Sequence, residues 1–194
     1  MHWQYQYVSQ MTAAQLQWAY DRLSPSRRAH VDSLLREESR AGSLTGEWLL
    51  RQLLRQHWGM EDPVILRGSS GCPVLQDAAL YLSITHSADL VACAVSDSPI
   101  GIDAERLKPF RWAMMEKICT PEERRYLLQQ LQPEGEICTD PDAVCRFFEL
   151  WTGKEAWFKL QGTGIRDLRS VNVPDLNRQL HRRDDYLIQI VSTP

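Results

Sequence analysis

The 194-residue sequence has no long hydrophobic run and no CxxC pair. Without about 18 consecutive apolar residues, a membrane-spanning helix is not expected. The first residues, Met1-His2-Trp3, lack the charged-then-apolar order of a signal peptide, which favours a cytoplasmic protein. Because the five cysteines are odd in number and scattered, we expect reduced thiols rather than a disulfide framework.

The sequence also has little net charge and no zinc-like histidine spacing. A formal net charge of -3 gives no general attraction to nucleic acid or to an anionic membrane, so neither is an expected partner. The five histidines never pair with each other or with cysteines at zinc spacing. With 43% hydrophobic residues, the chain is nevertheless able to bury a sizeable core.

Apolar spacing predicts a helical first third followed by short strands. Helices are expected over 12–23 and 27–58, separated at Ser24-Pro25, with Gly42 as a candidate interruption and an end near Gly59. Strands are expected further on, with turns between them, over 64–66, 81–85, 90–95 and 100–105.

The second half repeats this order of helices and then strands. Thr120-Pro121-Glu122-Glu123 has the cap, proline and acids of a helix start. A further helix is expected over 143–160, and strands over 171–173 and 186–191. We therefore predict an α+β protein with an N-terminal half, 1–99, and a C-terminal half, 100–194.

Asp103 and Glu105 form the first candidate site. Side chains alternate along a strand, so these two carboxylates should project from the same face. Such oxygen ligands suit Mg²⁺ that is shared with substrate phosphates. Spacing alone favours the simpler interpretation, a solvated strand end beside Arg106 and Lys108, because D-x-E is a short and common pattern.

Two further segments are ambiguous when taken alone. Glu155 and Lys159 are four residues apart on one helix face, which is most often only a surface ion pair. Thr85-His86-Ser87 offers two hydroxyls and an imidazole to a ligand, although a histidine that bonds to turn backbone is as good an explanation. No G-x-S-x-G occurs, so a serine hydrolase is not indicated.

Four segments, taken in order, resemble the motifs of 4'-phosphopantetheinyl transferases, and most of all the surfactin-synthetase-activating (Sfp-type) class. They extend over roughly positions 20 to 165 and are Gly71-Cys72-Pro73, Ser83-Ile84-Thr85-His86-Ser87, Gly101-Ile102-Asp103-Ala104-Glu105 and Trp151-Thr152-Gly153-Lys154-Glu155-Ala156-Trp157-Phe158-Lys159. The resemblance implies two pseudo-twofold-related halves with coenzyme A and Mg²⁺, or Mn²⁺ as an alternative ion, between them.

The resemblance also implies a reaction and roles for single residues. A serine of an apo acyl or peptidyl carrier protein would take the 4'-phosphopantetheine arm of coenzyme A and release adenosine 3',5'-bisphosphate. Asp103, Glu105 and Glu155 would bind the metal, and Glu155 and Lys159 would be catalytic. The coenzyme A contacts implied are Arg27, His30, Ser43, Gly71, Cys72, Pro73, Thr85, His86, Lys154 and Lys159.

Two positions depart from the family pattern. Cys72 stands where the family usually has lysine, and Gly42 where arginine is common; Arg40 or Arg67 could supply the missing charge. These departures leave open a non-catalytic coenzyme A or carrier-binding relative, and a Mg²⁺-dependent phosphohydrolase is a further alternative.

The segment from Lys108 to Met115 is a candidate docking site for the carrier protein. It combines cations with large apolar groups, which suits an acidic helix. A buried helix start is an equally good interpretation. Two halves in one chain would complete the site without oligomerisation, so we expect a monomer.

Overall fold

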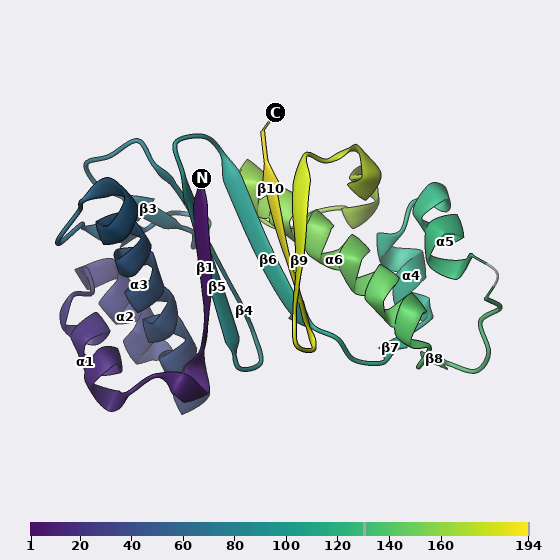
Figure 1. Ribbon diagram of the computed structural model, residues 1–194, viewed down its shortest axis with the longest axis horizontal. Coiled ribbons are helices and arrows are strands. Elements are labelled where there is room, and N and C mark those ends of the chain that lie inside the picture. Colours follow the sequence, from purple (N-terminus) through teal and green to yellow (C-terminus); the bar gives the residue numbers. More distant parts are fainter. Residues whose placement is uncertain (130, 194) are drawn as a thin grey trace.

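The computed structural model describes residues 1–129 and 131–193, and its first half is a five-stranded antiparallel sheet with three helices (Figure 1). The strand order is β1-β5-β4-β3-β2. The elements are β1 (His2–Tyr7), η1 (Val8–Gln10), α1 (Ala13–Asp21), α2 (Pro25–Ser33), α3 (Glu37–Trp58), β2 (Ile65–Arg67), β3 (Pro73–Leu75), β4 (Tyr81–Ser87) and β5 (Leu90–Ser96).

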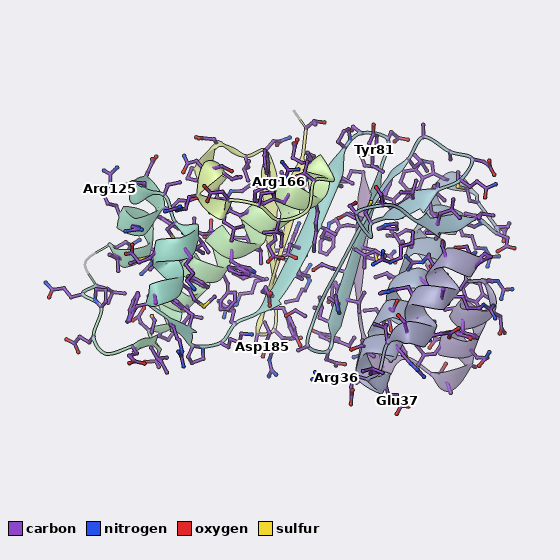
Figure 2. All side chains as sticks on the ribbon, turned by 180° about the vertical axis from the view of Figure 1, so that it is seen from behind. Arg36, Glu37, Tyr81, Arg125, Arg166 and Asp185 are labelled. Carbon is purple, nitrogen blue, oxygen red and sulfur yellow. The ribbon has the colours of Figure 1, made fainter. Side chains whose placement is uncertain are left out.

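The second half has a three-stranded antiparallel sheet in the order β6-β10-β9 and a small β7-β8 pair. Its elements are β6 (Ile100–Arg106), β7 (Phe110–Arg111), α4 (Ala113–Ile118), α5 (Pro121–Leu128), β8 (Ile137–Cys138), α6 (Pro141–Gln161), η2 (Leu168–Ser170), η3 (Val173–Asp175), β9 (Arg178–Arg183) and β10 (Tyr186–Ser192). From the opposite side, Arg36 and Glu37 lie together at the start of α3, while Arg125 on α5 lies at the far end (Figure 2).

The two sheets lie between the two long helices. Leucines of α3 pack on one face of the first sheet, against residues such as Val91 and Val95. The opposite face, with Leu90, Ala92 and Ala94, packs on the second sheet, and α6 covers the far face of that sheet. Figure 1 shows β6 running between the strands of the first sheet and β10.

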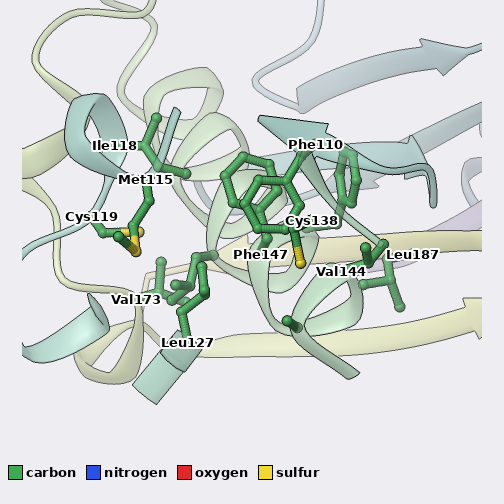
Figure 3. Close-up of a cluster of buried hydrophobic side chains, with 13 residues drawn as sticks. Phe110, Met115, Ile118, Cys119, Leu127, Cys138, Val144, Phe147, Val173 and Leu187 are labelled. Atoms are coloured by element: carbon green, nitrogen blue, oxygen red, sulfur yellow. The ribbon is translucent and has the colours of Figure 1, made fainter. Parts of the chain in front are cut away.

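A separate core packs against α6 at the end of the molecule that contains α4, α5 and the β7-β8 pair (Figure 1). The rings of Phe110 and Phe147 stack with centroids 3.9 Å apart, and Cys138 lies beside them (Figure 3). Met115 and Leu127 extend this cluster to α4 and α5. It anchors α6, which carries three of the expected site residues, Lys154, Glu155 and Lys159.

The predicted helices are confirmed with one correction. Thr120 forms a capping box at α5, and Gly59 ends α3 in the left-handed conformation. The expected interruption at Gly42 is wrong, because α3 runs through it and the break falls at Leu34–Arg36. A Cβ at Gly42 would only reach ordinary contact with His86 at 3.9 Å, so this position packs against β4 without disturbing the helix.

The predicted central strands are confirmed, whereas the strand expected over 171–173 is wrong. Val171 and Val173 are buried in a segment of short 3-10 turns, in which Pro174 supplies no amide for a ladder. The edge strands β1 and β9 were not predicted; β9 reads Arg-Gln-Leu-His-Arg-Arg and lacks the hydrophobic alternation of a buried strand.

The α+β class is confirmed, and the chain changes sheet between β5 and β6 at the predicted boundary of 1–99 and 100–194. Whether these halves are separate domains stays a prediction. In the part of the chain that the structure describes, no helix is long and apolar enough to cross a bilayer. All five cysteines are free thiols.

Candidate active site

The strands β4 and β6 belong to different sheets and are joined by side-chain hydroxyls. Three hydroxyls on alternate residues of β4 accept hydrogen bonds from alternate amides of β6, and we call them the hydroxyl ladder. The bonds run from Ile102 N to Ser83 Oγ at 3.0 Å, from Ala104 N to Thr85 Oγ1 at 3.2 Å, and from Arg106 N to Ser87 Oγ at 3.1 Å. The ladder brings the Thr85-His86-Ser87 and Asp103-Ala104-Glu105 motifs together.

Asp103 is buried at the centre of this junction. Its Oδ1 accepts a hydrogen bond from Thr85 Oγ1 at 2.9 Å. The same oxygen forms an ion pair with Lys159 Nζ at 2.7 Å. Its Oδ2 is buried and has no hydrogen-bond partner among the described residues. A buried carboxylate oxygen without a partner is costly, so this atom is a candidate ligand for a cation.

Two more carboxylates lie near Asp103. Glu105 accepts a hydrogen bond from Ser87 Oγ at 2.7 Å. The pKa of Glu155 is raised to about 7, first by burial and then by repulsion from Asp103, with Lys159 opposing the shift and Glu105 adding to it. Three acidic groups on β6 and α6 therefore share one electrostatic environment, with Lys159 as the nearby cation.

Two glycines allow α6 to lie close enough to the second sheet for this arrangement. A Cβ at Gly101 would lie 1.8 Å from the carbonyl oxygen of Ala156, and one at Gly153 would lie 2.2 Å from Gln189 Oε1. Such distances are far inside van der Waals contact. The glycine of Gly101-Ile102-Asp103 therefore allows the close approach that places Glu155 and Lys159 beside Asp103.

The three carboxylates suit a divalent ion that is completed by a phosphate. Within residues 1–129 and 131–193, no group of three or more His, Cys, Asp or Glu side chains is arranged to hold a metal ion as it stands. Mg²⁺ usually takes only one or two carboxylates and completes its shell with water and substrate phosphates. Asp103 Oδ2, which has no partner among the described residues, and the carboxylates of Glu105 and Glu155 are hard oxygen donors of this kind, so these residues fit the ion.

A cavity of about 470 Å³ opens beside these carboxylates, between the two halves. Eight of the ten expected coenzyme A residues line it: Arg27, His30, Ser43, Gly71, Cys72, Pro73, His86 and Lys159. They come from α2, α3, the segment at β3, β4 and α6. Residues distant in sequence therefore form one pocket, although no bound coenzyme tests their roles.

The pocket has a positively charged wall that other residues hold in place. Arg27 Nε pairs with the fully buried Glu47 at 2.6 Å, and Arg51 pairs with the other oxygen of Glu47 at 2.8 Å. The pKa of His30 is lowered, first by burial and then by Arg67 and Arg27. Because these groups converge on one wall, the wall suits a phosphate.

Lys154 does not lie in the pocket and is removed from the expected coenzyme A contacts. Its side chain is fully buried, where Nζ pairs with Glu123 Oε2 at 2.7 Å and donates to the carbonyl oxygens of Leu168 and Val171. Breaking such a buried pair would cost about 3–5 kcal/mol. Lys154 therefore ties α6 to α5 and to the following loop rather than binding substrate.

Thr85 also has a different place from the one expected. It is only 4% exposed and is absent from the pocket lining, and its hydroxyl donates to Asp103. Ser83, two residues earlier, lines the pocket instead. Strand alternation puts both hydroxyls on one face, so the sequence did not show which of them reaches the cavity.

Arg40 and Arg67 were the two candidates for supplying a missing positive charge, and the structure places them differently. Arg67 lines the pocket, whereas Arg40 donates to the carbonyl oxygens of Leu34 and Asp32 at the end of α2. Arg67 is therefore the one of the two that can replace the charge missing at Cys72 and Gly42. The apolar side of the pocket is formed by Leu34, Phe158 and Ile165.

The segment from Lys108 to Met115 is only partly available for docking. Phe110 and Met115 belong to the buried core, which favours the buried interpretation for both. Lys108 and Arg111 are exposed, and Trp112 is half-buried. Carrier docking on this segment stays a prediction that now depends on these three side chains.

The chain is similar in sequence to 4'-phosphopantetheinyl transferases. The family model described as the 4'-phosphopantetheinyl transferase superfamily matches residues 99–191. The transferase psf-1 of Bacillus pumilus is 35% identical over 126 residues, which is 63% of this chain and 51% of that protein. In this match the chain spans about half the length of its relative.

Two longer matches extend the similarity over most of the chain. Sfp of Bacillus subtilis (strain 168) is 27% identical over 173 residues, 87% of this chain and 71% of Sfp. HetI of Nostoc sp. is 30% identical over 167 residues, 82% of this chain and 68% of HetI. Both relatives are named 4'-phosphopantetheinyl transferases. With these matches and the geometry of the site, the chain belongs to the 4'-phosphopantetheinyl transferase superfamily.

Proposed function

We propose that this chain transfers the 4'-phosphopantetheine arm of coenzyme A to a serine of an apo carrier protein. One observation carries the proposal: Lys159 lines the cavity and also lies 2.7 Å from Asp103. A diphosphate held in the cavity would therefore lie within reach of the three carboxylates. Relatives named 4'-phosphopantetheinyl transferases support the same chemistry.

Different residues of the pocket would contact different groups of coenzyme A, according to their charge and shape. The wall of Arg27, His30 and Arg67 suits the 3'-phosphate, because guanidinium groups bind phosphate oxygens in pairs. Gly71, whose φ of 84° gives a tight turn, would border the adenine together with Pro73. His86 and Lys159 would face the diphosphate. This arrangement places the scissile phosphate next to β6.

The transfer requires a metal site, a base and a charged residue near the leaving group. Asp103, Glu105 and Glu155 would hold Mg²⁺, which when bound would neutralise charge on the diphosphate. Glu155 would take the proton of the serine hydroxyl, directly or through water, as the serine oxygen bonds to the β-phosphorus. The bond from that phosphorus to the bridging oxygen breaks, adenosine 3',5'-bisphosphate leaves, and Lys159 offsets its charge.

Mass spectrometry tests the proposal and separates its alternatives. The chain is incubated with several apo carrier proteins, coenzyme A and Mg²⁺. A transferase adds the phosphopantetheine mass to a carrier; a phosphohydrolase degrades coenzyme A and leaves the carriers unchanged; a binding relative does neither. A parallel run with excess chelator tests the Mg²⁺ dependence. Unmodified carriers throughout would contradict the proposal.

All of these residues come from a single chain, so the site needs no second copy, and we propose that the protein acts as a monomer.

His30 supplies a prediction about pH. Its lowered pKa makes the free imidazole neutral at pH 7, and a dianionic phosphate between Arg27 and Arg67 should raise that pKa. Coenzyme A binding should then take up a proton, and the affinity should rise as the pH falls from 8 through the bound-state pKa. Calorimetry in two buffers of different ionisation enthalpy at pH 7 measures this uptake.

The matched control is His57, which stacks on His2 at 3.6 Å and does not line the pocket. His30→Gln should abolish the proton uptake, and His57→Gln should preserve it. Equal proton uptake in both variants would mean that the bound phosphate of coenzyme A does not contact His30.

A further inference from the structure

The hydroxyl ladder does more than join two strands. Thr85 gives its proton to Asp103 at 2.9 Å while accepting from the amide of Ala104, and Ser87 gives its proton to Glu105 at 2.7 Å while accepting from the amide of Arg106. A hydroxyl has one proton. The amide of β6 donates to a lone pair of the hydroxyl oxygen, and an ionised carboxylate can only accept. The hydroxyl proton therefore points toward the carboxylate.

We propose that Thr85 and Ser87 are positioning residues that aim the carboxylates of Asp103 and Glu105 at the metal and the coenzyme diphosphate. The inference rests on the proposed function. It assigns the two hydroxyls to the carboxylates of β6 rather than to the coenzyme.

Burial makes the contact between Thr85 and Asp103 difficult for water to replace. Thr85 and Asp103 are 4% and 2% exposed, so water does not readily replace a lost bond between them. With Oδ1 occupied by Thr85 and Lys159, the remaining oxygen of Asp103, Oδ2, is left for a cation. Residues that orient metal ligands in this way typically change metal affinity or activity by about 10–100-fold when removed.

The same strand also serves the pocket. Ser83 and His86 line the cavity, and they belong to the same strand, β4, as the two hydroxyls that hold Asp103 and Glu105. Because β4 is a short, hydrogen-bonded strand, these residues keep a constant spacing. The first-half wall of the pocket and the carboxylates of the second half are thereby held in register by one row of hydroxyls.

Ser83 provides a matched comparison within the ladder. Its hydroxyl accepts from the amide of Ile102 at 3.0 Å, like the other two. Within the described residues, however, it donates to no carboxylate. Ser83→Ala and Ser87→Ala therefore remove the same kind of bond between strands, and only the second removes a contact to a carboxylate.

The test measures Mn²⁺ binding by electron paramagnetic resonance, with and without coenzyme A, on purified variants of the 194-residue chain. Ser87→Ala should weaken Mn²⁺ binding by about 10–100-fold. Ser87→Thr, which keeps the hydroxyl, should restore it to within a few-fold. Ser83→Ala should bind Mn²⁺ like the parent. A change in its KM for coenzyme A would reflect the place of Ser83 in the pocket lining. The Mg²⁺ concentration that half-saturates transfer should follow the same order.

Thermal melting separates positioning from stability. If the hydroxyls only joined the strands, both alanine variants would lower the melting temperature alike and leave Mn²⁺ binding unchanged; that result would overturn the inference. An equal loss of Mn²⁺ binding in Ser83→Ala would overturn it too. A parent that transfers phosphopantetheine without binding Mn²⁺ or Mg²⁺ would instead contradict the proposed metal site, and with it this inference.

Discussion

Asp103→Asn is expected to reduce Mg²⁺-dependent transfer by about 100-fold or more. The substitution keeps the size of the side chain but removes the charge of the residue whose Oδ2 is buried without a partner. A metal ion contributes several kcal/mol to stabilising charge in such reactions, and about 1.4 kcal/mol corresponds to a tenfold change in rate. The measurement is the initial rate of carrier modification at several Mg²⁺ concentrations.

The fold should survive this change, so that the loss can be assigned to the site. Asparagine is isosteric with aspartate, and the repulsion that raises the pKa of Glu155 is relieved. We expect the melting temperature to shift by no more than a few degrees. Asp185→Asn is the control, because Asp185 lies in the turn between β9 and β10 at the edge of the molecule (Figure 2) and is 46% exposed. Full activity in Asp103→Asn would contradict the assignment of Asp103 as a metal ligand.

Gly101→Ala is expected to have the largest effect on stability. The added Cβ would lie 1.8 Å from Ala156 O and 2.7 Å from Leu160 N, both backbone atoms of α6 that no rotamer change can move. Overpacking of a core usually costs about 1–3 kcal/mol, and a clash with backbone belongs at or above the upper end of that range. Urea denaturation measures the loss as a lower midpoint.

Any Gly101→Ala protein that folds should also be impaired in transfer, because α6 must move away from β6 and carries Glu155 and Lys159 with it. Gly42→Ala is the matched control for stability. Its Cβ would meet only His86 at 3.9 Å, and alanine in a helix interior is favoured over glycine by about 1 kcal/mol. An unchanged midpoint in Gly101→Ala would mean that the close contact between β6 and α6 is not required.

The local structure of this chain could be predicted where short-range physics decides it. Thr120 and Pro121 indicated a helix start because the cap and the proline act within one turn, and the capping box is present. The apolar run at 90–95 indicated a buried strand, and all its residues are buried in β5. The edge strand β9 was missed because most of its side chains are exposed and its sequence shows no apolar alternation.

The site was less predictable, because its geometry depends on packing between distant segments. Spacing alone favoured a solvated Asp103 and a surface Glu155–Lys159 pair, whereas Asp103 is buried and bonded to Lys159 from another element. The same limit explains Lys154 and Thr85, which were expected in the pocket. Their neighbours Glu123 and Asp103 are 31 and 18 residues away, and only these neighbours decide where each polar group points.

The sequence by itself determined the α+β class, most of the helices and central strands, and, through four ordered motifs, the family. These properties follow from hydrophobic periodicity, capping and residue identity, which act locally. Only the tertiary structure decided that Gly101 brings α6 against β6, that Arg67 rather than Arg40 faces the pocket, and that hydroxyls of β4 hold the carboxylates of β6. The reason is physical: burial, close approach and hydrogen-bond direction depend on which atoms meet, and that is set when the two halves pack together.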